Sequence, residues 1–337
     1  MALITKKKLI YPINEALRDY LKQQEREADA IAYDDLTRYS NSIPLYDQKG
    51  IDTLWETVLF DQSEMDNIHL KLKMVYSNLK SAGQIEIIDH LFIDRIDLCP
   101  FGNTKPFRIR IVNSINDNFD YFYIKRADAS RIYGLELEHL LSPNRINYIV
   151  DDNTLVEDHI IGVPGDQFIR NDLDDNYLNK VRLAKEFVKF NERTFVRLLG
   201  DMHSSNFVVA ITPDFEEVHY RIRAIDFDQQ SFEGRRAVYM PKYFKQNNAL
   251  IMLGMEVMTP ESMQQYQLEE HSLIVNRIRS SRYTLNELLS AMKTTPLSIT
   301  KNIHQLRKEL AEYHKDKRFL KCTNMGELVE LNLLQLE

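Results

Sequence analysis

Three polar side chains flank a predicted β-hairpin, and they constrain this 337-residue chain more than any other feature does. Asp201 and Asn206 precede the apolar run 207–211, and Asp226 follows the returning run 218–225. The residues between the two runs include a proline and an aspartate, which are typical of turns. A hairpin of this length returns Asp226 to the side of Asn206. We therefore expect the three polar groups to meet at one end of the hairpin, where loops usually carry functional residues.

The residue types of this trio suit phosphoryl transfer. Asp201 can orient an attacking hydroxyl group and accept its proton, while Asn206 and Asp226 can hold Mg²⁺ against the phosphates of ATP. Oxygen ligands of this kind, completed by water and phosphate, are what Mg²⁺ prefers. Each residue alone is equally typical of a turn or a cap, but the three in this order between two strands favour the catalytic interpretation. His203, in the same loop, is expected to be a structural hydrogen-bonding residue.

The two segments around the trio resemble motifs of the protein-kinase-like superfamily, in the branch of aminoglycoside phosphotransferases and choline kinases. The run Gly200-Asp201-Met202-His203-Ser204-Ser205-Asn206 is similar to the G-D-x-H-x-x-N catalytic loop of that branch, and Ile225-Asp226-Phe227-Asp228 is similar to its I-D-F-[DE] metal segment. The resemblance implies an α+β, two-lobed protein-kinase-like fold with a small β-rich N-lobe and a larger helical C-lobe. It also implies ATP and Mg²⁺ as cofactors and a small hydroxyl-bearing molecule as the phosphate acceptor.

The same resemblance directs attention to an upstream lysine and to a glutamate on a helix. Lys125 ends a predicted strand, and the resemblance implies that it reaches the α- and β-phosphates. A short helix is predicted over Ser130–Leu141, with Ser130 as its N-cap. Its Glu136 is preferred to Glu138 as the partner of Lys125, because Glu136 lies beside the apolar stripe of the helix. Lys125 taken alone is also typical of a solvated strand residue.

A hinge is the third upstream feature. Residues 155–166 form an apolar strand followed by a turn that contains glycine and proline, which looks like the hinge of the family. The resemblance implies that backbone groups around Asp158, His159 and Ile160 meet the adenine ring. Counting every motif, the resemblance covers about residues 105–232.

The chain also departs from the family pattern. Leu199 stands where most of the family has the histidine of H-G-D, and no glycine-rich phosphate loop is visible. The segments 101–106 and 114–118 are the two alternatives for a loop that covers the phosphates. No A-P-E segment follows Asp226, so a protein substrate is less favoured than a small molecule.

The remaining residues indicate a helical scaffold in three parts. Residues 1–82 are predicted to be an added helical segment, 83–162 the N-lobe, and 163–337 the C-lobe with the catalytic loop and a helical acceptor region. A strand is predicted over Thr194–Leu199, directly before the catalytic loop. Apolar side chains at helical spacing predict helices near residues 13–21, 68–79, 177–188, 243–258, 264–280, 284–292 and 300–314.

Composition limits the partners and the compartment. A net charge of −7 gives no broad cationic field, so nucleic acid is not an expected partner. The two cysteines form neither a disulfide framework nor a zinc site. No apolar stretch reaches the length of a membrane span, so we expect no membrane partner and a cytoplasmic location. The sequence does not predict the oligomeric state.

Other classes of function remain open at this point. A kinase-fold protein that binds a nucleotide or a partner without phosphoryl transfer is favoured by Leu199 and by the missing lid glycines, and opposed by the intact trio. A metal-dependent phosphoesterase is the second alternative, because the run 200–203 also resembles the D-x-H motif of binuclear phosphatases. That family would need further metal motifs downstream, which this chain lacks. Nucleotide transfer onto proteins by the same fold also stays open.

Overall fold

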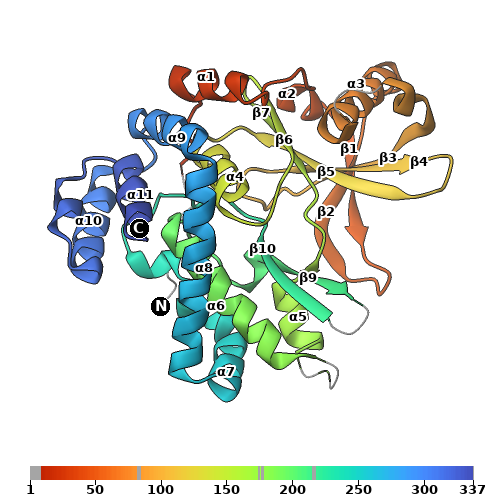
Figure 1. The fold of residues 1–337 in the computed structure, drawn as a ribbon. Helices are drawn as coiled ribbons and strands as arrows, with labels where there is room; N and C mark the ends of the chain where they lie inside the picture. Colours follow the sequence, from red (N-terminus) through yellow and green to blue (C-terminus); the bar gives the residue numbers. More distant parts are fainter. Residues whose placement is uncertain (1–8, 82–84, 174, 176–177, 215–217, 337) are drawn as a thin grey trace. The chain divides into compact units, whose positions relative to one another are not determined.

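The protein is an α+β structure with a large β-sheet, a small β-sheet and many helices, drawn in Figure 1 from a computed structural model. The structure describes residues 9–81, 85–173, 175, 178–214 and 218–336. The chain forms two compact units, each built from segments that are distant in sequence. The sheet unit comprises Arg18–Asp128 and Ile146–His159, and the helical unit comprises Met1–Leu17, Ala129–Arg145 and Ile160–Glu337.

The sheet unit contains seven strands in the order β1-β2-β3-β4-β5-β7-β6, all paired antiparallel. Its strands are β1 (Asn41–Tyr46), β2 (Asp52–Leu59), β3 (Leu91–Leu98), β4 (Phe107–Asn113), β5 (Phe119–Arg126), β6 (Tyr148–Asp151) and β7 (Thr154–Asp158). Its helices are α2 (Tyr33–Leu36), α3 (Gln62–Ser81) and the 3-10 helix η1 (Ile85–His90), while α1 (Glu15–Gln23) crosses the boundary between the units.

Alternation along the strands builds the core of the sheet unit. In β4, Phe107, Ile109 and Ile111 are buried, and they pack in one apolar cluster with α3 residues such as Leu72. Because successive side chains of a strand point to opposite faces, Arg108 lies on the other face of β4. There its guanidinium group contacts the Asp97 carboxylate at 2.8 Å and lies over the ring of Trp55.

The prediction of an added helical segment over residues 1–82 is wrong in part. Helices are present at the predicted places, as α1 and α3, but β1 and β2 form a hairpin that joins the seven-stranded sheet. The hairpin is closed by a local turn, and its place in the sheet comes from the pairing of β2 with β3. The Asp47 carboxylate accepts hydrogen bonds from the amides of Lys49 and Ile51, and Gly50 has a φ of 76°, which glycine adopts readily.

The helical unit contains a three-stranded sheet in the order β10-β9-β8, with β8 (Val163–Pro164), β9 (Phe207–Pro213) and β10 (Val218–Ala224). Its longer helices are α4 (Ala129–Leu141), α5 (Gly165–Asn171), α6 (Lys180–Val196), α7 (Asn248–Val257), α8 (Pro260–Ser280), α9 (Arg282–Thr294), α10 (Thr300–His314) and α11 (Met325–Leu334). Helix α6 packs against α7, α8 and β10, which places it beside the small sheet (Figure 1).

The predicted hairpin is confirmed. Strands β9 and β10 pair antiparallel, with Phe207 opposite Ala224, and the amide of Ile225 donates to the carbonyl oxygen of Asn206 at 3.0 Å. These contacts bring the residues before β9 and those after β10 to the same end of the hairpin.

The strand predicted over Thr194–Leu199 is wrong, because α6 continues to Val196. The Thr194 hydroxyl group donates back to the carbonyl oxygen of Phe190, and Arg197 donates to the carbonyl oxygen of Arg193. The Arg197 side chain thereby satisfies a carbonyl oxygen in the last turn of the helix, where backbone partners are missing. Only Leu199 keeps a strand-like contact, an isolated bridge to Gln230.

Several other elements can be compared with the sequence predictions. Helices α8, α9 and α10 are confirmed, whereas the helix predicted from residue 243 begins only at Asn248, after two short 3-10 turns, and α11 has no predicted counterpart.

Helix α4 begins at Ala129, so Ser130 is not its N-cap. Its hydroxyl group instead donates to the carbonyl oxygen of Gln230 at 2.6 Å. Helix α4 also belongs to the helical unit rather than to the predicted N-lobe segment 83–162. Within the described residues, no helix has the length and apolarity needed to cross a membrane.

Candidate functional site

The predicted catalytic loop is braced against the segment that follows β10. The amide of Gly200 donates to the carbonyl oxygen of Gln229 at 3.2 Å, and the amide of Ser231 donates to that of Leu198 at 2.8 Å. A side chain at Gly200 would approach the same Gln229 carbonyl oxygen to 3.1 Å, so the small residue permits the close pairing. The two segments carrying Asp201 and Asp226 are therefore held together by backbone contacts.

Asp201 has a left-handed backbone conformation, with a φ of 64°. Its amide donates to the carbonyl oxygen of Val238, and its own carbonyl oxygen accepts from the amide of His203 and from the side-chain amide of Asn206 at 2.8 Å. A non-glycine residue held at positive φ is uncommon and concentrates at functional sites. The bond from the Asn206 nitrogen turns the amide oxygen of that side chain away from the Asp201 carbonyl group, as a ligand for a cation requires.

Four carboxylates gather around this loop, and we call Asp201, Asp226, Asp228 and Glu233 the acid cluster. Burial, together with the negative charges of Asp226, Glu233 and Asp228, raises the pKa of Asp201 to about 7. Burial also raises the pKa of Glu233. Like charges in a partly desolvated position are unfavourable unless cations or protons neutralise them. The raised pKa of Asp201 means that its protonated form is favoured relative to a free aspartate.

Arg131 of α4 is a member of the site that the sequence analysis missed. Its guanidinium group is 2% exposed and contacts Asp226 at 3.0 Å and Asp228 at 2.8 Å. The helix comes close enough for this contact because Gly134, one turn later, packs on the ring of Phe227. One signal in the sequence could have found it. Two carboxylates beside a buried phenylalanine need a cation to compensate their charge. Arg131 is the arginine of the helix predicted over Ser130–Leu141.

His203 behaves as predicted, as a structural residue of the loop. Its Nδ1 atom accepts a hydrogen bond from the amide of Ser205 at 3.3 Å, which caps the short 3-10 helix at Ser204–Asn206. Its Nε2 atom lies 3.8 Å from the Asp201 carboxylate. Burial lowers the pKa of His203, so the ring is neutral at neutral pH.

The residues predicted to hold Mg²⁺ are brought to one place by the backbone contacts at the base of the hairpin. Among the described residues, no group of three or more histidines, cysteines, aspartates or glutamates is arranged to hold a metal ion. Mg²⁺ commonly binds to one or two protein carboxylates and keeps several waters, so Asn206 and Asp226 fit that pattern. The excess negative charge of the acid cluster favours a cation, whereas Arg131 already offsets part of that charge.

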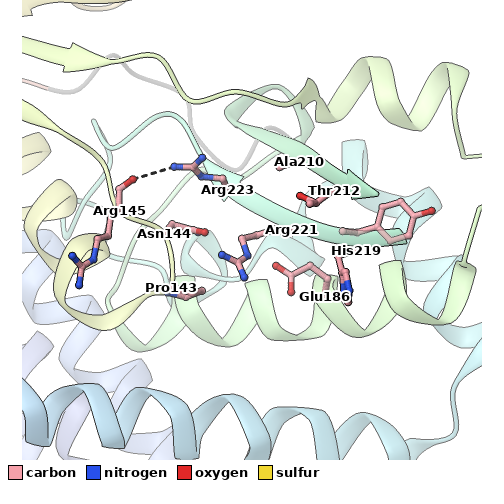
Figure 2. Close-up of a pocket in the computed structure, with 10 residues that line it drawn as sticks. Pro143, Asn144, Arg145, Glu186, Ala210, Thr212, His219, Arg221 and Arg223 are labelled. Atoms are coloured by element: carbon pink, nitrogen blue, oxygen red, sulfur yellow. Dashed lines mark hydrogen bonds between the residues drawn. The ribbon is translucent and has the colours of Figure 1, made fainter. Parts of the chain in front are cut away.

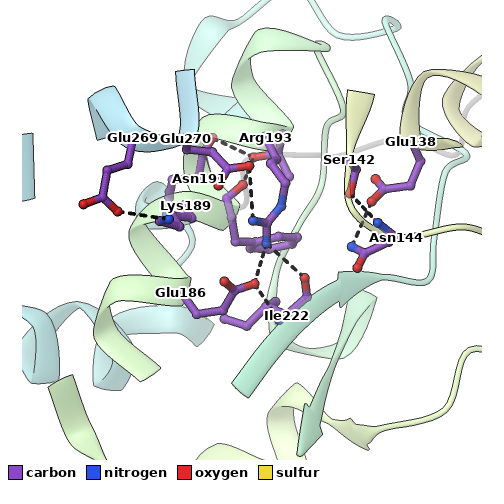
Figure 3. A network of polar contacts seen from close by, with 12 residues as sticks. Glu138, Ser142, Asn144, Glu186, Lys189, Asn191, Arg193, Ile222, Glu269 and Glu270 are labelled. Atoms are coloured by element: carbon purple, nitrogen blue, oxygen red, sulfur yellow. Dashed lines mark hydrogen bonds and ion pairs between the residues drawn. The ribbon is translucent and has the colours of Figure 1, made fainter. Parts of the chain in front are cut away.

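A buried polar network lies beside the catalytic loop in the helical unit (Figure 3). Arg193 of α6 contacts Glu186 at 2.5 Å and Glu270 of α8 at 3.5 Å. One turn later, Arg197 pairs with the fully buried Glu138 of α4, and its carbonyl oxygen accepts from the side chain of Gln230 at 2.5 Å. The ion pairs join α4, α6 and α8, and the Gln230 side chain links α6 to the segment that bears Asp228.

Lys125 lies in the sheet unit, where it is a buried residue of β5 rather than a solvated one. It is 8% exposed as a residue, and its Nζ atom lies 2.7 Å from the carboxylate of Glu157 on β7. Glu136 is a buried residue of the helical unit, so its pairing with Lys125 stays a prediction. Both carboxylate oxygens of Glu138 are engaged, by Arg197 and Asn144, which removes the alternative partner.

The predicted hinge lies where the chain passes from one unit to the other, between His159 and Ile160. Asp158 ends β7, and its carboxylate pairs with Lys80 at 2.5 Å. His159 contacts the hydroxyl group of Tyr123 at 3.2 Å, and burial lowers its pKa. The role of these three residues in holding a base stays a prediction.

Comparison with known proteins adds little to this picture. No family model matches the chain, and no curated protein matches it. Among solved structures, the chain is similar to "Titin kinase and its flanking domains", with 13% sequence identity and a TM-score of 0.30. The match covers 73% of this chain and 55% of that one, so it spans about half of the other protein's length. A likeness at this TM-score carries no argument about the fold, activity or ligands of this chain.

Proposed function

We propose that this protein is an ATP- and Mg²⁺-dependent phosphotransferase whose acceptor is a hydroxyl group on a small molecule. The observation that carries the proposal is the acid cluster around a strained loop. Asp201 is held at positive φ, and its pKa is raised to about 7 by burial and by neighbouring carboxylates. A carboxylate with a pKa near the working pH is well suited to accept a proton from an attacking hydroxyl group.

Each residue of the cluster has a distinct role in this proposal. The Asp201 carboxylate orients the acceptor hydroxyl group and takes its proton, and His203 keeps the loop folded by capping the turn after it. Asn206 and Asp226 would hold Mg²⁺, which neutralises charge on the phosphates when it is bound with ATP. Lys125 would bind the phosphates, with Glu136 as its proposed partner.

A small acceptor is supported by the segment after Asp228. Residues 229–243, all of which the structure describes, fold into short turns rather than an extended segment. Ser231 and Tyr239 are fully buried, and the Tyr239 hydroxyl group donates to the carbonyl oxygen of Glu233 at 2.6 Å. Such a packed segment offers no strand on which a substrate peptide could align.

A nucleotide- or partner-binding protein without transferase activity is the second candidate. It is favoured by the contact of Arg131 with Asp226, because a buried guanidinium group occupies the carboxylate that Mg²⁺ would use. In that case the acid cluster and Arg131 form a structural ion-pair network, and Asp201 has no substrate proton to accept.

One assay separates the two candidates. The wild-type protein is incubated with Mg²⁺, γ-labelled ATP and a panel of amino alcohols, sugars, nucleosides and aminoglycosides, with added proteins alongside. We expect label on a small molecule, and a fall of about 10²–10⁴-fold in turnover for Asp201→Asn. Asp66→Asn, which removes an exposed carboxylate from α3, is the matched control and should keep full turnover. Label confined to protein would reject the small acceptor.

ATP binding is measured separately by calorimetry, so that a missing acceptor is not mistaken for a missing nucleotide site. Asp201→Asn should bind Mg·ATP nearly as well as the wild type does, whereas Asp226→Ala should lose the Mg²⁺ dependence of binding. Lys125→Met should weaken binding, with Lys71→Met of α3 as control. Binding without transfer to any acceptor favours the second candidate. No binding at millimolar Mg·ATP contradicts the phosphotransferase and a nucleotide-binding role alike.

A further inference from the structure

A second site lies in the helical unit, outside the acid cluster. A cavity of about 580 Å³ is lined by residues of the loop after α4, of α6 and of strands β9 and β10 (Figure 2). The charged side chains in its wall are Arg145, Arg221, Arg223, His219 and Glu186. Cavities of 300–1,000 Å³ are typical of small-molecule sites, and no residue of the proposed catalytic set lines this one.

The hairpin explains why the cavity is both hollow and basic. Residues 219, 221 and 223 alternate along β10, so their side chains share one face of the strand. Directly opposite on β9 stand two small residues, Thr212 across from His219 and Ala210 across from Arg221. Small side chains beside long ones leave the cationic groups around an open space rather than against a packed neighbour.

The positive charge of the cavity is only partly offset. Among the described residues that line it, Glu186 is the one carboxylate, and its Oε1 atom is already hydrogen-bonded to the protein. That atom accepts from Arg193 at 2.5 Å and from the amide of Ile222 at 3.0 Å, as Figure 3 shows. The Arg223 guanidinium group is held in place by its 3.2 Å bond to the main-chain carbonyl oxygen of Arg145.

Charged groups of both signs also lie at the edge of the cavity, beside His219. The His219 ring contacts Arg182 at 3.3 Å on one side and lies 3.7 Å from the Asp214 carboxylate on the other. Behind the cavity, burial and the positive charges of Arg193 and Arg221 lower the pKa of Arg277. The groups around the cavity therefore carry charges of both signs, and the three arginines that line it remain the dominant charge.

We propose that this cavity binds a compact phosphate-bearing molecule with at least two negative charges. The planar guanidinium group donates two parallel hydrogen bonds to phosphate oxygens, and three arginines line this space of small-molecule size. The concave shape selects a small ligand over an extended polymer. This assignment is independent of the phosphotransferase proposal, because it uses neither the acid cluster nor Lys125.

Pyrophosphate is the probe for the test, used in EDTA so that no metal-dependent site contributes. Its affinity is measured by calorimetry for the wild type and for Arg221→Gln and Arg145→Gln, which change exposed residues of the cavity wall. Each variant should raise Kd about tenfold to a hundredfold, as expected for losing hydrogen bonds to a charged group. Arg279→Gln, which removes an exposed arginine of α8 outside the cavity, should leave Kd unchanged.

Three results would overturn the assignment. The first is the absence of saturable binding at millimolar pyrophosphate. The second is binding that survives Arg221→Gln but is lost in Asp226→Asn, because it would place the anion at the acid cluster. The third is tighter binding of citrate than of pyrophosphate, which would assign the cavity to polycarboxylates. Unchanged thermal unfolding of both cavity variants shows that a loss of affinity is not a loss of fold.

Discussion

Replacing Asp201 with asparagine should make the protein more stable at neutral pH, and the gain should grow as pH rises. In the folded protein the pKa of Asp201 is raised to about 7 from 3.8, first by burial and then by the charges of Asp226, Glu233 and Asp228. The folded state therefore binds a proton that the unfolded state has already released. Stability is at its fullest below the unfolded pKa and is lost as pH rises towards 7.

The magnitude follows from the two pKa values. At about 1.4 kcal/mol per pH unit, the full effect is about 4 kcal/mol, of which about 2.6 kcal/mol lies between pH 5 and pH 8. The asparagine introduced at this position would carry no charge at any pH while keeping the size and the hydrogen-bonding shape of the side chain. The difference in unfolding free energy between Asp201→Asn and the wild type should thus increase by about 2–3 kcal/mol over that range.

Urea unfolding at pH 5, 6, 7 and 8 in EDTA measures this difference directly. Asp66→Asn, on the exposed face of α3, controls for the loss of one carboxylate from the protein. A difference that stays flat with pH, or that falls, would mean that Asp201 is well solvated in the folded protein. In that case the acid cluster would not exist as described, and the observation that carries the proposed function would be lost.

Three further substitutions test the packing and the charge balance of the helical unit. Gly165→Ala should destabilise the protein by about 1–3 kcal/mol, because a Cβ atom there would clash with the ring of Phe207. Gly254→Ala meets only a flexible methionine end at 3.2 Å and should be neutral or stabilising, so equal shifts in Tm would contradict this reasoning. Arg131→Gln should cost about 3–5 kcal/mol at pH 8 and less at pH 5, as judged by urea unfolding; a cost that does not depend on pH would contradict a role in offsetting carboxylate charge. If Asp226 is a metal ligand, the same variant should be stabilised more by Mg²⁺ than the wild type is, and an unchanged response would argue against that role.

The parts of the site that could be predicted from the sequence are those fixed by short-range geometry. Asn206 and Asp226 come together because a two-stranded hairpin joins them, and its turn and apolar runs are visible in the sequence. His203 is predictable as a structural residue for the same reason, since it caps the turn two residues after itself. Local contacts of this kind depend little on the rest of the fold.

The parts that the sequence did not predict depend on distant partners. The helix α6 extends through a β-prone run because Arg193 and Arg197 find buried carboxylates on α4 and α8, which no local pattern reveals. The hairpin of β1 and β2 is not predicted because strand propensity in a short segment is weak until a neighbouring sheet is known. Here that neighbour is β3, which follows the twenty-residue helix α3.

Arg131 connects the structural and the functional interpretations of the site. A buried arginine that contacts both Asp226 and Asp228 holds two like charges near each other. The same arrangement holds the Asp226 carboxylate in a fixed orientation, as a metal ligand requires. The opposing interpretation is that Arg131 takes the place of a cation and makes the site structural. The two interpretations differ in one measurable quantity: in the first, removing the charge of Arg131 tightens Mg²⁺ binding by relieving repulsion, and in the second, Mg²⁺ binds to neither protein.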